Sequence, residues 1–144
     1  MAVEKTKVLI ADDHRVVREG LSAILRAAGD LDVVGEAQDG QEAIQKAREL
    51  QPDVILMDVS MPRVNGVEAT RTIKRESPHI GIVALTMYDE EKYIFDLVRA
   101  GATGYLLKDS DSAQIISAIR ATPAYHGLAD QTPGWRYRHD SGRL

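Results

Sequence analysis

Five side chains in this sequence are suited to holding a phosphoryl group beside a divalent cation. They are three aspartates, a threonine and a lysine: Asp12, Asp13, Asp58, Thr86 and Lys108. Carboxylates that lie close together repel each other, and a hard cation such as Mg²⁺ relieves that repulsion. A carboxylate can also act as the nucleophile in phosphoryl transfer, while a lysine neutralises charge on the transferred oxygens. This chemistry requires that residues far apart in the sequence meet in space.

Short apolar segments that end at these residues would bring them together. The clearest is residues 54–57, four consecutive apolar residues that stop at Asp58 and are followed by the loop signal Asn65-Gly66. A run this short and this apolar is typical of a strand buried on both faces of a parallel sheet. Four similar segments are predicted strands: residues 7–11, 31–37, 80–86 and 104–108.

Segments with apolar residues at helical spacing follow each predicted strand, and several have recognisable ends. Gly29 is expected to close the first helix, and the expected caps of later helices are Asp39, Asn65, Asp89 and either Asp109 or Ser110. Five βα units in about 115 residues indicate an α/β fold with a doubly wound parallel sheet. Ligands bind at the carboxyl ends of the strands in such sheets, so we expect the five residues to meet there.

Composition sets further limits. At 144 residues, 44% of them hydrophobic, the chain fits one globular domain. It has no apolar run near the ~20 residues that span a bilayer and no signal-peptide core, and it has no cysteine. We therefore expect a cytoplasmic protein without membrane contact. The net charge of −4 argues against nucleic-acid binding by this chain alone.

The character of the sequence changes at Thr122. Residues 122–144 contain glycine and proline but no apolar period. We interpret this segment as an irregular tail, a linker or a cloning remnant, too short for a second domain and without a DNA-binding domain. The predicted domain is therefore residues 1–121.

Each candidate residue also has an ordinary structural interpretation. Asp13 could cap the first helix, Asp58 could be a turn residue and Lys108 could be a solvated surface lysine. His14 and His79 are expected to be surface residues, since neither has the spacing of a metal ligand. Taken one at a time, these residues fit their ordinary interpretations. Taken together they do not, because all five candidates fall at the same end of successive predicted strands.

The sequence resembles the receiver domain of response regulators in two-component signalling, over about residues 7–121. The resemblance rests on the acidic pair, the segment Leu56-Met57-Asp58-Val59-Ser60-Met61-Pro62, Gly66, Leu85-Thr86 and Gly104-Tyr105-Leu106-Leu107-Lys108. Residues 8–14, and Asp109 after the lysine, resemble the NarL/FixJ subfamily. Members of that subfamily usually carry a C-terminal LuxR-type helix-turn-helix.

This resemblance implies a flavodoxin-like, five-stranded parallel sheet of order 2-1-3-4-5 with five helices. It implies that Asp58 accepts a phosphoryl group from a sensor histidine kinase in the presence of Mg²⁺. The metal would be held by Asp13, Asp58 and the backbone carbonyl of Ser60, with Asp12 assisting through water. Lys108 would hold a phosphoryl oxygen.

The resemblance also implies a switch, in which Thr86 and Tyr105 move together and change the surface around the fourth helix and fifth strand. The aromatic residues of the body cluster in this region: Tyr88, Tyr93, Phe95 and Tyr105. Aromatic residues are enriched in interfaces, so this surface is our candidate for partner contact. An equally weighted alternative is that Phe95 and some of the tyrosines only pack the core.

The implied role is regulatory rather than enzymatic. The chain would be the receiver part of a DNA-binding transcriptional regulator that can form a homodimer on phosphorylation, with its helix-turn-helix outside this chain. The alternative is a stand-alone receiver. A phosphatase with an aspartyl nucleophile is a remote alternative, because Ser60 stands where that class has a second aspartate. A flavin site is disfavoured because the first loop is acidic instead of rich in serine and glycine.

Overall fold

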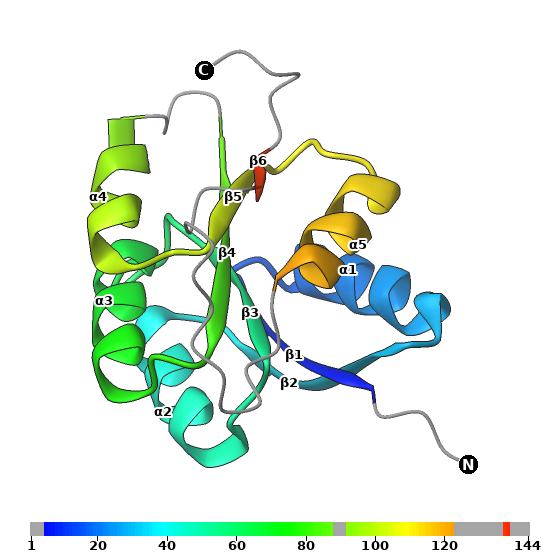
Figure 1. The fold of residues 1–144 in the computed structure, drawn as a ribbon, viewed down its shortest axis with the longest axis horizontal. Coiled ribbons are helices and arrows are strands. Elements are labelled where there is room, and N and C mark those ends of the chain that lie inside the picture. The colour runs from blue at the N-terminus through cyan, green and yellow to red at the C-terminus, as the bar shows by residue number, and fades with distance from the viewer. Residues whose placement is uncertain (1–4, 88–91, 123–136, 139–144) are drawn as a thin grey trace.

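The fold is a parallel sheet with helices on both faces (Figure 1). A computed structural model describes residues 5–87, 92–122 and 137–138. The strands are β1 (Thr6–Ala11), β2 (Leu31–Ala37), β3 (Val54–Asp58), β4 (Gly81–Thr86), β5 (Gly104–Leu107) and β6 (Tyr137–Arg138). The described helices are α1 (Arg15–Ala28), α2 (Gly40–Leu50), α3 (Gly66–Glu76), α4 (Ile94–Ala100) and α5 (Ser112–Ala121).

The strand order is β2-β1-β3-β4-β5-β6, and every neighbouring pair is parallel. The first five strands and the five helices confirm the predicted flavodoxin-like arrangement. The strand β6 is an addition in the segment for which sequence analysis expected an irregular tail, and it pairs with Gly104 and Tyr105 of β5. A strand of two residues has no apolar period, so local sequence could not indicate it.

Apolar side chains form a layer on each face of the sheet, because neighbouring residues in a strand point to opposite faces. In β1, Val8 and Ile10 pack in one cluster with α1 and α5, and Leu9 and Ala11 pack in another with α2 and α3. The four apolar residues of β3 alternate in the same way and are all fully buried. Burial on both faces explains why this strand is a continuous apolar run.

The helix caps predicted for α2 and α3 are present. The Asp39 carboxylate accepts the backbone N–H of Glu42 at 2.8 Å, and the Asn65 side chain accepts that of Glu68 at 3.0 Å. Each cap satisfies a helix N–H group that has no partner within the helix. The predicted cap at Asp89 lies outside the described residues.

The predicted cap of α5 is wrong by one or two residues. Asp111, rather than Asp109 or Ser110, accepts the backbone N–H of Gln114 at 2.8 Å, and the Gln114 side chain accepts that of Asp111 at 3.0 Å. The chain first turns after β5, where the Ser110 N–H donates to the Leu107 carbonyl at 3.0 Å. This turn delays the start of the helix.

Gly66 allows α3 to begin directly beside the end of β3. Its backbone N–H donates to the carbonyl of Val59 at 2.8 Å. A Cβ atom at this position would collide with the backbone oxygen of Asp58 and lie 2.8 Å from the Cα of Val59. The missing side chain therefore lets the helix support the strand end that carries Asp58.

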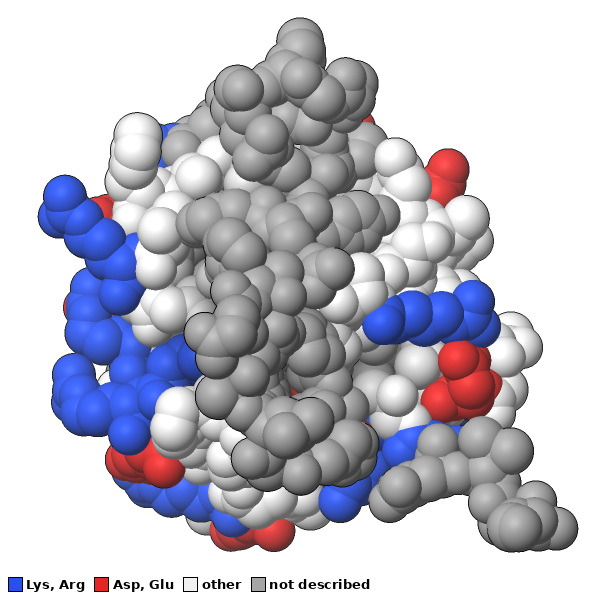
Figure 2. Space-filling model, viewed as in Figure 1, with Lys and Arg blue, Asp and Glu red and all other residues white. Residues whose placement is uncertain are grey.

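Basic residues gather on the side of the molecule formed by α3 and α4, as Figure 2 shows in the same view as Figure 1. The last turn of α3 contains Lys74 and Arg75, and that of α4 contains Arg99. Positive charge near a helix C-terminus is stabilised by the helix dipole. This side is thus basic although the chain as a whole carries a net charge of −4.

Candidate functional site

The carboxyl ends of β1, β3 and β5 bring together two buried aspartates and a lysine. Asp12 follows β1, Asp58 is the last residue of β3, and Lys108 follows β5. The Lys108 Nζ lies 2.9 Å from Asp58 Oδ1 and 3.5 Å from Asp12 Oδ2. Both aspartate side chains are 0% exposed, and that of Lys108 is 17% exposed. The ordinary interpretation of Lys108 as a solvated surface residue is therefore wrong.

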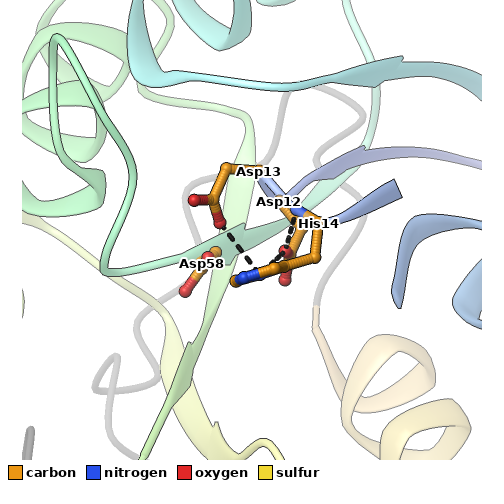
Figure 3. A group of neighbouring side chains, drawn as sticks. All are labelled: Asp12, Asp13, His14 and Asp58. Carbon is orange, nitrogen blue, oxygen red and sulfur yellow. Dashed lines mark hydrogen bonds and ion pairs between the residues drawn. The ribbon is translucent and has the colours of Figure 1, made fainter. Parts of the chain in front are cut away.

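Asp13 and His14 complete an acidic cluster around Asp58 (Figure 3). One potential ligand atom from each of Asp12, Asp13, His14 and Asp58 lies within 4.8 Å of all the others. His14, not Asp13, occupies the N-cap position of α1, and it makes no side-chain capping bond. The Asp13 carboxylate is therefore not used as a cap and faces the cluster.

Three buried carboxylate oxygens in this cluster have no hydrogen-bond partner among the described residues: Asp12 Oδ2, Asp13 Oδ1 and Asp58 Oδ2. Of these, Asp12 Oδ2 lies 3.5 Å from Lys108 Nζ, and Asp13 Oδ1 lies 3.1 Å from His14 Nδ1. Buried anionic oxygens are costly unless a cation or a hydrogen-bond donor faces them. These three carboxylate oxygens, at one edge of the sheet, fit the ligand preference of Mg²⁺.

Burial raises the pKa of Asp58 to about 7, although the hydrogen bond from Lys108 acts in the opposite direction. The negative charge of Asp12 raises this pKa further, and the backbone N–H of Ser60, 3.2 Å from Asp58 Oδ1, lowers it. For Lys108, burial lowers the pKa, but the hydrogen bond and charge of Asp58, with a contribution from Asp12, outweigh burial and raise it overall. The single positive charge of Lys108 thus offsets only part of the free-energy cost of burying the two carboxylates of Asp12 and Asp58.

Ser60 and Asp13 line a pocket of about 330 Å³ next to the acidic cluster. Its other lining residues come from the loop after β3 and from the start of α4: Val59, Met61, Pro62, Asn65 and Tyr93. This pocket borders the acidic cluster at Asp13.

Thr86 and Tyr105, the predicted switch residues, are both buried. The Thr86 hydroxyl donates to the Leu106 carbonyl at 3.4 Å, so in this structure it is directed towards β5. The Tyr105 side chain belongs to an apolar cluster that also contains Ala84 and Leu97.

The predicted aromatic surface is divided between core and exterior. The Phe95 side chain is 77% exposed, whereas Tyr105 packs in the core and Tyr93 is partly buried. Tyr88 lies outside the described residues. The core-packing alternative is thus right for Tyr105 and wrong for Phe95.

Two residues at the site, His14 and Arg18, were not predicted from the sequence. His14, expected to be an unrelated surface residue, has Nδ1 at 3.1 Å from Asp13 Oδ1 and 3.3 Å from Asp12 Oδ1. Arg18 of α1 donates from Nη1 to the Asp12 backbone carbonyl at 2.7 Å and from Nε to Glu36 at 3.0 Å. The sequence contains a signal for each residue. His14 directly follows the acidic pair Asp12-Asp13, and Arg18 lies on the helix that begins just after that pair.

A family model described as the response regulator receiver domain matches residues 8–120. The chain belongs to this family. The receiver domain is 49% identical over 121 residues to the transcriptional regulatory protein YxjL of Bacillus subtilis, covering 84% of this chain and 56% of that protein. It is 50% identical over 115 residues to the oxygen regulatory protein NreC of Staphylococcus carnosus, covering 79% of this chain and 53% of that protein.

Solved structures agree with this family. The signal receiver domain of the response regulator NarL from Mycobacterium tuberculosis is 34% identical with a TM-score of 0.77, covering 82% of this chain and 95% of that one. A LuxR-family response regulator from Aurantimonas is 36% identical, also with a TM-score of 0.77, covering 82% and 84%. The resemblance to NarL/LuxR-type regulators is thereby confirmed, and these matches do not favour the phosphatase alternative.

Two further facts concern the length of the relatives and the hydrophobicity of the helices. The receiver domain spans about half the length of the curated relatives it matches. Within the described residues, no helix has the length and apolar character needed to cross a membrane.

Proposed function

We propose that Asp58 is the phosphoacceptor of this receiver domain and takes its phosphoryl group from a phosphohistidine of a sensor histidine kinase. The observation that carries this proposal is the unequal environment of its two oxygens. Oδ1 is held by Lys108 and the Ser60 N–H, whereas the buried Oδ2 has no hydrogen-bond partner among the described residues. A carboxylate anchored through one oxygen can present the other to an incoming phosphorus atom.

In the transfer, the Asp58 oxygen forms a bond to phosphorus as the bond from phosphorus to the kinase imidazole nitrogen breaks. The products are an aspartyl phosphate and the free kinase histidine. Lys108, already 2.9 Å from Asp58, is placed to pair with an oxygen of the transferred group. The protein's own chemistry is limited to this transfer and to hydrolysis of the aspartyl phosphate, which is a regulatory rather than an enzymatic role.

Asp13, Asp58 and the backbone carbonyl of Ser60 would hold Mg²⁺, with Asp12 assisting through water. The buried carboxylate oxygens without hydrogen-bond partners support this assignment. When bound, Mg²⁺ neutralises negative charge on the carboxylates and on the transferred oxygens. Arg18 positions one of these residues, because it binds the backbone carbonyl of Asp12.

Thr86 and Tyr105 would transmit phosphorylation to the surface. Thr86 is fully buried, and turning its hydroxyl from the Leu106 carbonyl to the phosphoryl group would open space between β4 and β5. Movement of Tyr105 into that space would alter the packing of α4, whose Leu97 shares its cluster. The exposed Phe95 on the same helix would then contact a partner.

The larger protein would be a cytoplasmic transcriptional regulator, with residues 1–121 as its receiver domain and residues 122–144 as a tail or linker. Support comes from relatives about twice as long that are named as transcriptional regulators. DNA would be bound by a helix-turn-helix outside this chain, with a homodimer formed on phosphorylation. The matches favour this role over a stand-alone receiver.

The test is phosphorylation by acetyl phosphate, read by intact mass spectrometry with and without Mg²⁺. We expect a Mg²⁺-dependent phosphoryl adduct on the wild-type chain and none on Asp58→Asn. Asp53→Asn is the matched control, because Asp53 lies at the opposite end of β3 and its side chain accepts the Lys7 backbone N–H, a bond that the asparagine amide oxygen can also accept. An adduct on Asp58→Asn equal to wild type, or none on any folded variant, would contradict the proposal.

A further inference from the structure

The imidazole of His14 lies beside the carboxylates of Asp12 and Asp13 (Figure 3). The residue is placed by its own backbone, whose N–H donates to Asp12 Oδ1 at 2.8 Å. Its ring then lies with Nδ1 at 3.3 Å from Asp12 Oδ1 and 3.1 Å from Asp13 Oδ1. The side chain is 66% exposed, and a hydrogen bond between Nδ1 and Asp12 Oδ1 holds the ring in place, rather than packing or a helix cap.

The separations match those of neighbouring ligands around one metal ion. Two ligands at right angles, each about 2.1 Å from an ion, are about 3.0 Å apart. The Nδ1 distances to the two carboxylates are 3.1 and 3.3 Å. The shorter contact lacks hydrogen-bond geometry, because Asp13 Oδ1 has no hydrogen-bond partner among the described residues.

A second observation points independently to a cation. Asp58 Oδ2 is unpartnered within the described part of the chain, and its residue is 0% exposed. Asp58 ends β3, whereas Asp13 and His14 are consecutive residues after β1, and one potential ligand atom from each of the three residues lies within 4.8 Å of the others. They would form a mixed site of oxygen and nitrogen ligands.

We infer that His14 adapts this site to first-row transition-metal ions, with its Nδ1 as a ligand beside the carboxylates of Asp13 and Asp58. Imidazole favours ions such as Co²⁺, Ni²⁺ and Zn²⁺, whereas Mg²⁺ prefers oxygen ligands and water. A transition-metal ion would therefore compete with Mg²⁺ for the site and gain affinity from His14. The inference rests on the proposed function, since both ions use the same carboxylates.

The test compares Co²⁺ and Mg²⁺ binding to the full chain. The chain has four histidines, so His126 and His139 are first replaced by glutamine to remove competing imidazoles. In that background, Co²⁺ affinity is measured by calorimetry and Mg²⁺ affinity by amide shifts in NMR spectra. We expect His14→Gln to lower the ratio of Co²⁺ to Mg²⁺ affinity by about tenfold or more. The matched control His79→Gln, whose imidazole is hydrogen-bonded to Gln51, should leave the ratio as it was.

A spectroscopic signature separates direct ligation from a structural effect. Bound Co²⁺ should shift imidazole proton resonances far outside the diamagnetic range, and these signals should vanish in His14→Gln but persist in His79→Gln. An unchanged ratio in His14→Gln, with Mg²⁺ still bound, overturns the inference and leaves the proposed function standing. Co²⁺ binding that survives Asp13→Asn also overturns it. Failure of both ions to bind overturns the proposed Mg²⁺ site itself.

Discussion

Replacing Asp58 with asparagine is expected to stabilise the metal-free receiver domain at neutral and alkaline pH. Burial raises the pKa of Asp58 from its ordinary value of 3.8 to about 7. At a pH between these two pKa values, Asp58 is protonated in the folded state and ionised in the unfolded state. The stability associated with the neutral carboxyl is therefore present below about pH 4 and is lost as the pH rises through about 7. Asparagine keeps the shape of the side chain and cannot ionise.

The size of the effect follows from the same numbers. A pKa displacement from 3.8 to about 7 corresponds to about 4 kcal/mol at higher pH. This is an upper limit, because surrounding groups and solvent relax around an ionised carboxylate. We expect the free energy of unfolding of Asp58→Asn to exceed that of wild type by at least about 1 kcal/mol at pH 8. At pH 5 most of Asp58 is neutral in the folded state, so the gain should fall by more than half.

The assay is urea unfolding followed by circular dichroism at pH 5 and pH 8, with EDTA present. Asp32→Asn is the matched control, since Asp32 is exposed on β2 and its replacement should change stability by less than about 0.5 kcal/mol. Saturating Mg²⁺ in place of EDTA should narrow the gap between wild type and Asp58→Asn at pH 8. If Asp58→Asn is no more stable than wild type at pH 8, or if its gain in stability is the same at pH 5 and pH 8, Asp58 does not carry a buried, destabilising charge.

Three further outcomes follow from the contacts at the site. Gly66→Ala should lower the free energy of unfolding by about 3 kcal/mol in urea titrations, because the new methyl group would collide with the backbone of Asp58; stability equal to wild type would contradict this. Arg18→Gln should weaken Mg²⁺ binding about tenfold in NMR titrations, since Arg18 holds the Asp12 carbonyl. The exposed Arg15→Gln is its control, because Arg15 pairs only with Glu19 among the described residues. Lys108→Ala should cost about 2 kcal/mol at pH 8 without metal, because it leaves two buried carboxylates without their cation; a loss equal at pH 5 would argue against that reason.

Local pattern in the sequence determined most of the fold. The apolar run before Asp58 predicted a strand buried on both faces, and residues 54–57 are fully buried. The caps at Asp39 and Asn65 depend on a side chain reaching a backbone N–H three residues away, which neighbouring residues alone decide. The edge that gathers Asp12, Asp58 and Lys108 followed from the general rule that parallel strands end on one side of the sheet.

Only the tertiary structure decided how side chains from separate elements meet. The pairing of β6 with β5, for example, joins segments more than 30 residues apart. The sequence placed His14 beside two aspartates but could not show its ring turned back onto them. Periodicity and capping are properties of neighbouring residues, whereas the pKa of Asp58 and the approach of His14 depend on burial and on distances between side chains, which exist only once the chain has packed.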